Sequence, residues 1–543
     1  MRCIPGPRLS LLVVLAFIGC ACTANNGAQV RIESLGTGGT AVRVAVPDGL
    51  RDRFERIAAI VAPSGQSGQS IQILQNDAAA DLRVIVNPPG LPGAVVRRWA
   101  IVAAAARIDL DDLPLKTVMD AAGTGSLYVP QDSLGLVEQL FLQRAGLRPL
   151  SAEEIPKRLA AEPAAFAIVP ADTVGTRVHA LSIDGVDPVR GSEDLGSYPL
   201  VTRVTFEVLR HTQSVEALAA RLPQAMERVD PQPLRLDFTG DLIPSRCVYD
   251  QMRRSGDWAA PFRQVAGRLR SADLTAGSLD ASISVRGAPI GCRETFNLLT
   301  VPEVIQGFSL AGLDVITVAA NHAKDCGGAG SCGDAAFLET LSRLRAAGIQ
   351  PTGGGATLAE ARRPAVLRAG GIRFAFLGYD DVAPYYHATE HGAGTAGLDP
   401  ATLADDIRSA HQVADVVIVM PHWGVEYTAD PTARQREAAK IAIDAGATLV
   451  VGNHPHVVQA AAPVGDGYVA WALGNFVFDQ DWSQETTEGV VLEATFAGPH
   501  LAAVRFLPIR IQNQIQPVFL GSEAGKPILQ RMIAAAAHLD KNP

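Results

Sequence analysis

Hydrophobic runs and polar breaks alternate along most of the chain and divide it into two regions. In residues 28–229, apolar runs such as "AVRVAVP" (41–47) and "AFAIVPAD" (165–172) alternate with helical stretches such as "SLGLVEQLFLQRAG" (133–146). This alternation predicts an α/β layer fold. The sequence "DPQP" (230–233) predicts a linker, because its two prolines interrupt both helix and strand.

The pattern is sharper in the second region, which we place at residues 234–520, followed by a helical tail at 521–543. Seven apolar runs, rich in β-branched residues and bounded by polar residues or glycine, predict strands. Helical stretches lie between several of them, which predicts a largely parallel or mixed sheet layered by helices. The runs are "LRLDFTGD" (234–241), "ADLTAGSLD" (272–280), "LDVITVAANH" (313–322), "IRFAFLGYD" (372–380), "ADVVIVMPHWG" (414–424), "ATLVVGNHPH" (447–456) and "GYVAWALGNFVFD" (467–479).

Residues 1–20 predict a leader that is not part of the fold. Arg2 and Arg8 precede the apolar run "LSLLVVLAFIGC" (9–20). This run is too short to span a bilayer as a stable helix. Its end resembles a bacterial lipobox with Cys20 as the lipidated residue and 21–27 as a tether. We therefore expect a lipid-anchored protein on the extracellular face of the cytoplasmic membrane. Simple cleavage, which would release a secreted protein, is the alternative.

Composition and charge narrow the class of protein. With 48% hydrophobic and 19% charged residues the chain is an ordinary globular protein, and its net charge of −9 without a basic stripe argues against nucleic acid as a partner. Four cysteines remain beyond the leader and the tether, and an even number in an oxidising compartment predicts two disulfides with three alternative connectivities. A metal site at the last two is less favoured, because they lack CxxC spacing and a second ligand pair. The four are Cys247, Cys292, Cys326 and Cys332.

Five of the predicted strands end in residues that can bind a metal ion. Ligands collect beyond the carboxyl ends of strands in an open α/β sheet, so we expect these distant residues in one cleft. Imidazole and carboxylate together suit Mn, Zn or Fe, and a shared carboxylate can bridge two ions. Each of these residues taken alone could instead form a turn or cap a helix, but ligand-type residues at five strand ends together indicate a metal site. The residues are Asp241, Asp280, Asn321, His322, His422, His454 and His456.

Over residues 234–507 the sequence resembles the CapA family of capsule-synthesis proteins, which is associated with poly-γ-glutamate. The blocks "FTGDLIPSR", "AANHAKDCG", "HWGVEY", "GNHPHV" and "LGNFVFD" carry the resemblance. That family is similar to the calcineurin-like metallophosphoesterases, which implies a layered α/β/β/α sandwich for this domain. In the smaller α/β domain before it, residues 179–210 loosely resemble the late part of a solute-binding domain, where a crossover returns to the first lobe. A structural or docking module is the alternative for that domain.

The resemblance also implies a role for each matched residue. Asp241 matches the first aspartate ligand, and Asp280 matches the bridging carboxylate, where relatives more often carry glutamate. His322 matches a histidine that contacts the substrate or donates a proton. Ile243 stands where the phosphoesterase DxH pattern has a histidine, so we expect one well-held ion and leave the second open. The remaining matched ligands are Asn321, His422, His454 and His456.

Three further residues are candidates for the same site. Arg246 can offer its charge to an anionic substrate oxygen, or it forms a surface salt bridge. Glu426 in "HWGVEY" can handle a proton or orient a histidine, or it is only a charge before a helix. The resemblance places Asn475 near the cleft as a substrate contact.

The sequence therefore predicts an extracytoplasmic, metal-dependent hydrolase or transferase of capsule or poly-γ-glutamate biosynthesis. The expected partners are an anionic envelope polymer such as poly-γ-glutamate, the membrane and other capsule-synthesis proteins. The alternative is a non-catalytic, membrane-tethered binding or assembly component, which Ile243 and the N-terminal domain favour. A solute receptor that acts through residues 28–229 is a third possibility.

Overall fold

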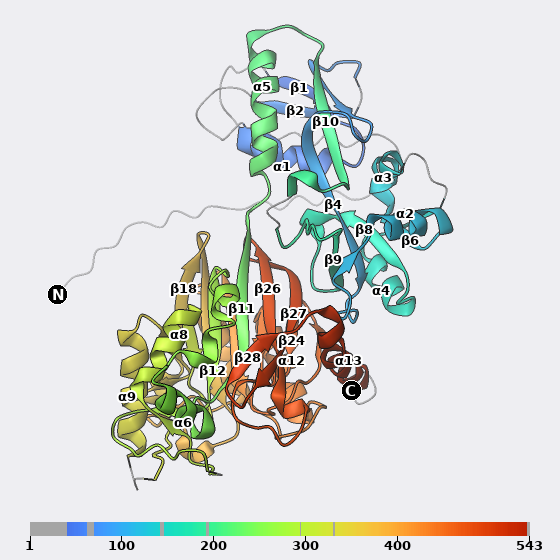
Figure 1. Cartoon of the computed structure of the whole chain (residues 1–543). Helices are drawn as coiled ribbons and strands as arrows, with labels where there is room; N and C mark the ends of the chain where they lie inside the picture. The colour runs from blue at the N-terminus through green and yellow to red at the C-terminus, as the bar shows by residue number, and fades with distance from the viewer. Residues whose placement is uncertain are drawn as a thin grey trace, which may run out of the picture.

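The computed structural model of the chain describes residues 41–61, 70–75, 77–141, 146–191, 195–293, 295–328 and 332–539. The expected leader, the tether and Cys20 lie outside the described residues. The described chain forms a smaller α/β domain followed by a larger one (Figure 1). Each described helix is too short or too polar to cross a membrane.

Two lobes make up the N-terminal domain, and both include part of β4 (Ala94–Ala104). The first half of β4 pairs with β10 (Val201–Val208), and its second half pairs with β8 (Phe166–Pro170) and β9 (Val178–Ile183), all antiparallel. Strand β10 also pairs with β3 (Leu82–Val86). The chain therefore returns to the first lobe before it leaves the domain.

Helices cover the strands of both lobes. In α1 the buried residues Phe54, Ile57, Ala58 and Val61 recur at helical spacing and form one apolar face. This face and α5 pack on the core of the first lobe. The other elements of the first lobe are β1 (Val42–Ala45), α1 (Arg51–Val61), β2 (Ile71–Leu74) and α5 (Gln213–Arg228). Those of the second lobe are β5 (Asp112–Leu113), α2 (Leu115–Thr124), β6 (Leu127–Pro130), α3 (Leu134–Leu140), β7 (Leu147–Leu150) and α4 (Glu154–Ala161).

The C-terminal domain contains two sheets that pack face to face. In spatial order, the first sheet contains β16 (Gln350–Thr352), β15 (Val315–Thr317), β12 (Leu274–Leu279), β11 (Pro233–Leu242), β26 (Glu488–Ala497), β27 (His500–Gln512) and β28 (Gln516–Phe519), with β25 (Asn475–Val477) beside β11. The second contains β18 (Ala365–Ala369), β19 (Ile372–Asp380), β21 (Val416–His422), β22 (Leu449–Val451), β24 (Gly467–Ala470) and β23 (Ala461–Val464). Phe238 and Phe496 of the first sheet meet Phe374 and Ile418 of the second in the core between them.

Helices cover the outer faces of both sheets and complete the layers, which confirms the predicted α/β/β/α sandwich. Those on the first sheet are α6 (Arg246–Ser255), α7 (Ala266–Leu269), α8 (Ile305–Ala311) and α9 (Gly333–Ala346). Those on the second are α10 (Leu358–Ala361), α11 (Pro400–Ala410) and α12 (Ala433–Asp444), while α13 (Ser522–Leu539) packs beside β27. The short pairs β13 (Ser282–Ile283) with β14 (Leu299–Thr300) and β17 (Gly354–Gly355) with β20 (Gly394–Thr395) lie outside the two sheets.

One strand prediction is wrong. The run 467–479, expected as a single strand, forms β24 and β25, and these two strands belong to different sheets. Between them Gly474 adopts φ +74°, a left-handed conformation that suits glycine. The break lets the chain cross from the second sheet to the first, where β25 pairs with β11.

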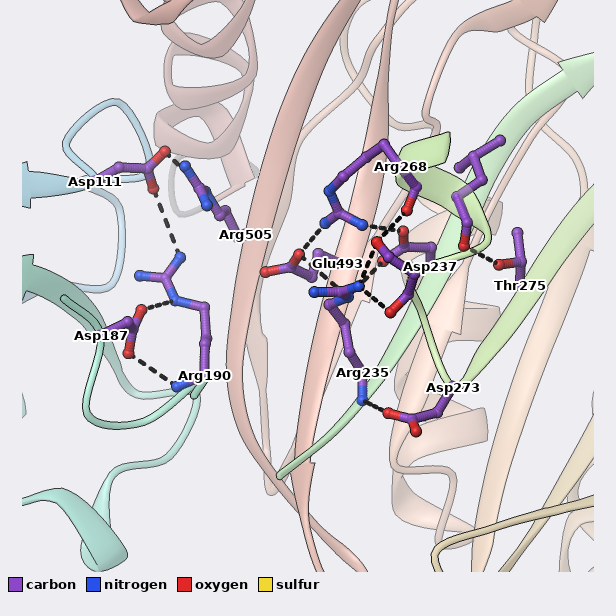
Figure 2. Close-up of polar contacts among 12 residues, drawn as sticks. Asp111, Asp187, Arg190, Arg235, Asp237, Arg268, Asp273, Thr275, Glu493 and Arg505 are labelled. Carbon is purple, nitrogen blue, oxygen red and sulfur yellow. Dashed lines mark hydrogen bonds and ion pairs between the residues drawn. The ribbon is translucent and has the colours of Figure 1, made fainter. Parts of the chain in front are cut away.

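Polar contacts join the second lobe to the C-terminal domain (Figure 2). The Arg505 guanidinium on β27 donates a hydrogen bond to Asp111 at 3.0 Å, and Arg190 lies 3.7 Å from the same carboxylate. Ala502 and Ala503 of β27 pack in the apolar cluster of the second lobe. The second lobe is thus fixed to the edge of the first sheet.

The four predicted cysteines form two disulfides. Cys247 pairs with Cys292, 45 residues further along the chain, and Cys326 pairs with Cys332, 6 residues further. The structure therefore selects one of the three connectivities that the sequence left open.

Candidate metal centre

The carboxyl ends of five strands meet at one end of the sandwich. Asp241 lies at the end of β11, Asp280 directly follows β12, and His422 is the last residue of β21; all three are fully buried. Because β11, β12 and β15 run parallel in one sheet, as β21 and β22 do in the other, their ends point to the same place. The sequence brings Asn321–His322 there after β15, and 454–456 after β22.

His422 lies at the middle of the cluster. Its Nε2 is 2.8 Å from Asn321 Oδ1 and 3.2 Å from His454 Nδ1. The same Nε2 is 3.8 Å from Asp280 Oδ2, and its Nδ1 is 3.8 Å from Asp241 Oδ1. Four of the predicted ligands are therefore gathered around the imidazole of a fifth, His422.

The sixth predicted ligand, His456, contacts the other carboxylate oxygen of Asp241. Its Nδ1 is 3.3 Å from Asp241 Oδ2 and 3.0 Å from Asn475 Oδ1. The Asn475 amide nitrogen donates to Gln480 Oε1 and to the Thr486 carbonyl. These contacts engage the side-chain oxygen and nitrogen of Asn475, the expected substrate contact, and hold its amide against His456.

The charges of the cluster favour a bound cation. Within the described chain, neither Asp241 nor Asp280 forms an ion pair with arginine or lysine; both face histidine. Burial raises the pKa of Asp280 to about 6, with Asp241 adding to the rise and His322 opposing it. Burial also lowers the pKa of His422 well below its usual range and that of His454 to about 3. Neutral imidazoles have free lone pairs, which is the form that binds metal ions.

Several buried polar atoms of the cluster have no hydrogen-bond partner within the described chain. They include one carboxylate oxygen each of Asp241 and Asp280 and both polar atoms of Asn453. Buried polar groups are normally satisfied, so such a concentration calls for an explanation. The donor set of imidazole, carboxylate and amide oxygen fits Zn, Mn or Fe. Sequence analysis did not select Asn453, although this residue is the first polar one after β22.

His322 has a carboxylate partner that sequence analysis also missed. Its Nδ1 lies 2.6 Å from Asp325 Oδ2, which also accepts a hydrogen bond from the Leu298 amide. Burial alone lowers the pKa of His322, but the negative charges of Asp280 and Asp325 outweigh it and raise the pKa to about 9. The imidazole is thus held in its protonated form beside the cluster. The signal in the sequence is the three-residue spacing of "HAKD".

Arg246 approaches the cluster from the start of α6. Its guanidinium lies 3.2 Å from Asp479 Oδ1 and 5.3 Å from the centre of the Phe478 ring. Because the side chain of Asp479 is 0% exposed, this ion pair is internal and is not the surface salt bridge considered above. Arg246 Nε has no hydrogen-bond partner among the described residues.

Backbone strain is concentrated at this site. Seven described non-glycine residues have a positive φ; two of them belong to the cluster, and two more lie next to it. Left-handed backbone costs energy in residues other than glycine and persists where the surrounding structure enforces it, often at functional sites. The four are Arg246 (φ +52°), Tyr427 (+61°), His454 (+100°) and His456 (+59°).

The fold and the cluster define the class of protein: a layered α/β/β/α protein with metal-ligand residues at its strand ends. The family profile described as "Bacterial capsule synthesis protein PGA_cap" matches residues 235–480. The "PGA biosynthesis protein CapA" of Bacillus subtilis (strain 168) is 30% identical over 260 residues, which cover 48% of this chain and 67% of that protein. The chain belongs to this capsule-synthesis family, as its sequence motifs predicted.

One further relative and one solved structure are similar to parts of this chain. The "Capsule biosynthesis protein CapA" of Bacillus anthracis is 28% identical over 314 residues, 55% of this chain and 74% of that protein. Among solved structures, a putative 5'-nucleotidase from Staphylococcus aureus aligns with a TM-score of 0.34 and 12% identity over 55% of this chain and 58% of that one. At that score the structural likeness adds nothing to the functional argument.

Proposed function

We propose that the C-terminal domain is a metal-dependent hydrolase or transferase that acts on an anionic envelope polymer in capsule biosynthesis. One observation carries the proposal: buried carboxylate, imidazole and amide groups converge at the strand ends without an arginine or lysine ion pair to Asp241 or Asp280 in the described chain. Two relatives are described as capsule and PGA biosynthesis proteins, so poly-γ-glutamate is the first substrate to test.

Each residue of the site has a distinct task in this proposal. A bound divalent cation would supply Lewis acidity and lower the pKa of water. His322 donates a proton to the leaving group, and Asp325 fixes the orientation of its ring. Arg246 holds an anionic oxygen of the substrate. The residues that would hold the cation are Asp241, Asp280, Asn321, His422, His454 and His456.

We place the protein outside the cytoplasm, anchored by Cys20. Two disulfides support this placement, because such bonds persist in oxidising compartments. The leader-like residues 1–20 support it independently.

Metal content and turnover, measured together on the purified full chain, test the proposed function. We expect stoichiometric Mn, Zn or Fe and hydrolysis of a model phosphoester or of poly-γ-glutamate, and we expect chelation to remove both. His422→Ala and His454→Ala should lose metal and rate, whereas His411→Ala, an exposed histidine bonded to the Gly446 carbonyl, should keep both. Turnover that survives chelation would contradict the proposal.

A non-catalytic assembly component is the second candidate. It is favoured by Ile243, a fully buried apolar residue where phosphoesterases carry a ligand. A metal-loaded protein that binds poly-γ-glutamate without cleaving any substrate would support this candidate over the enzyme.

A further inference from the structure

The side chain of Ile243 is apolar and packed in the core, so it cannot bind a metal ion. Ile243 is 0% exposed and packs in the apolar cluster between the first sheet and its helices. Its amide donates to the Val477 carbonyl at 2.7 Å, which fixes this part of the chain beside β25. A cation next to Asp241 and His456 therefore needs a ligand from another part of the chain.

The loop after β21 reaches the same place. Two backbone hydrogen bonds attach it to the loop after β22: the Trp423 amide donates to the Asn453 carbonyl at 3.1 Å, and the Tyr427 amide donates to the Pro455 carbonyl at 2.8 Å. Glu426 lies between these two attachment points, so it is held against the histidine loop.

The Glu426 carboxylate faces the two histidines of that loop. One ligand atom each of Glu426, His454 and His456 lie within 4.8 Å of one another. One carboxylate and two imidazoles are a common ligand set for zinc and related ions.

We propose that Glu426 is a metal ligand that replaces the missing histidine at position 243, so that the site holds two divalent cations. The carboxylate approaches from the second sheet, whereas position 243 belongs to the first. The inference rests on the proposed metal-dependent function and revises the expectation of a single well-held ion. It also gives Glu426 a role that is neither proton transfer nor orientation of a histidine.

Titration of the metal-free full chain with Mn²⁺ tests this inference, followed by calorimetry and by electron paramagnetic resonance. We expect two ions per chain and the spin-coupled signal of a close pair in the wild type. Glu426→Gln keeps the size of the side chain but removes its charge, so we expect one ion, loss of coupling and a second Kd weakened at least about 10-fold. Glu426→Asp should give an intermediate Kd. Glu437→Gln, an exposed glutamate on α12, is the matched control and should bind like the wild type.

The possible results separate this inference from the proposed function. Two equally tight, coupled ions in Glu426→Gln would overturn the role of Glu426 and leave the proposed function standing. A single bound ion in the wild type would likewise overturn the role of Glu426 and leave the proposed function standing. No bound ion in the wild type would overturn both.

Discussion

Two aspartates of β11 are equally buried but differ in their neighbours. Asp237, in the middle of the strand, accepts a hydrogen bond from the Arg268 guanidinium at 2.7 Å and lies 4.0 Å from Arg235 (Figure 2). Asp241, near its end, forms ion pairs only with His422 and His456 among the described residues. Both carboxylates are 0% exposed. One strand thus carries a buried charge paired with arginine in its middle and, near its end, a buried charge without a permanent cation.

The same contrast holds between the two ends of the C-terminal domain. At the end that adjoins the N-terminal domain, Arg505 of β27 donates a hydrogen bond to Asp111 of the second lobe at 3.0 Å, and Arg190 lies 3.7 Å from the same carboxylate. At the strand ends, histidines take the place of arginine and lysine, and burial lowers the pKa of two of them, His422 and His454. Buried charge is costly unless it is paired, so the paired end is structural. The strand ends instead hold buried carboxylates without an arginine or lysine partner among the described residues. Sequences depart in this way from what stabilises a fold mainly at functional sites.

Exchange of each aspartate of β11 for asparagine should give the largest effect and test the comparison directly. Asp241→Asn removes charge from a metal ligand, and we expect the affinity for Mn²⁺ to fall at least about 100-fold. Asp237→Asn should leave the number of bound ions unchanged. Equilibrium dialysis with metal analysis measures both, and equal metal loss in the two variants would break the comparison.

The next effect concerns turnover without metal loss. His322→Ala should lower kcat by about 10²–10⁴-fold, because a positioned proton donor contributes that much, while metal content stays constant. Asp325→Asn should lower kcat less and shift the pH profile to lower pH, since Asp325 helps to raise the pKa of His322. Loss of metal in either variant would show instead that these residues are structural for the cluster.

Removal of each disulfide should lower the free energy of unfolding by a different amount. The double variant Cys247→Ser/Cys292→Ser opens the longer loop, and we expect the free energy of unfolding to fall by about 2–4 kcal/mol. Cys326→Ser/Cys332→Ser opens a loop of 6 residues and should cost less. Denaturant unfolding under non-reducing conditions measures both. The reverse order would contradict the loop argument.

The smallest effect is expected at the domain junction. Burial alone raises the pKa of Asp111, but His179, Arg505 and Arg190 outweigh it and lower the pKa to about 2. Because the folded pKa lies below the unfolded one, the contribution is complete above about pH 4 and is lost as the pH falls to about 2. Asp111→Asn should cost about 1 kcal/mol at pH 7 and nothing near pH 2. Asp466→Asn, at the exposed pair with Arg177, is the control and should change stability by less than about 0.5 kcal/mol.

Strand periodicity and strand-end chemistry predicted the main features of the C-terminal domain. Parallel strands bring their carboxyl ends together, so the strand pattern predicted that Asp241, Asp280 and His422 lie close to one another, as the structure shows. The division of 467–479 between two sheets could not be predicted, because it depends on one left-handed glycine within an apolar run. The proximity of Glu426 to His454 depends on backbone hydrogen bonds between distant loops, which leave no periodic signal.

Anomalous diffraction from crystals of the full chain soaked in Mn²⁺ tests the central claim most directly. The account predicts strong peaks between Asp241, Asp280, His422 and His454, with one of two ions in contact with Glu426. A map without any peak among these side chains, at a Mn²⁺ concentration that saturates related sites, would contradict it.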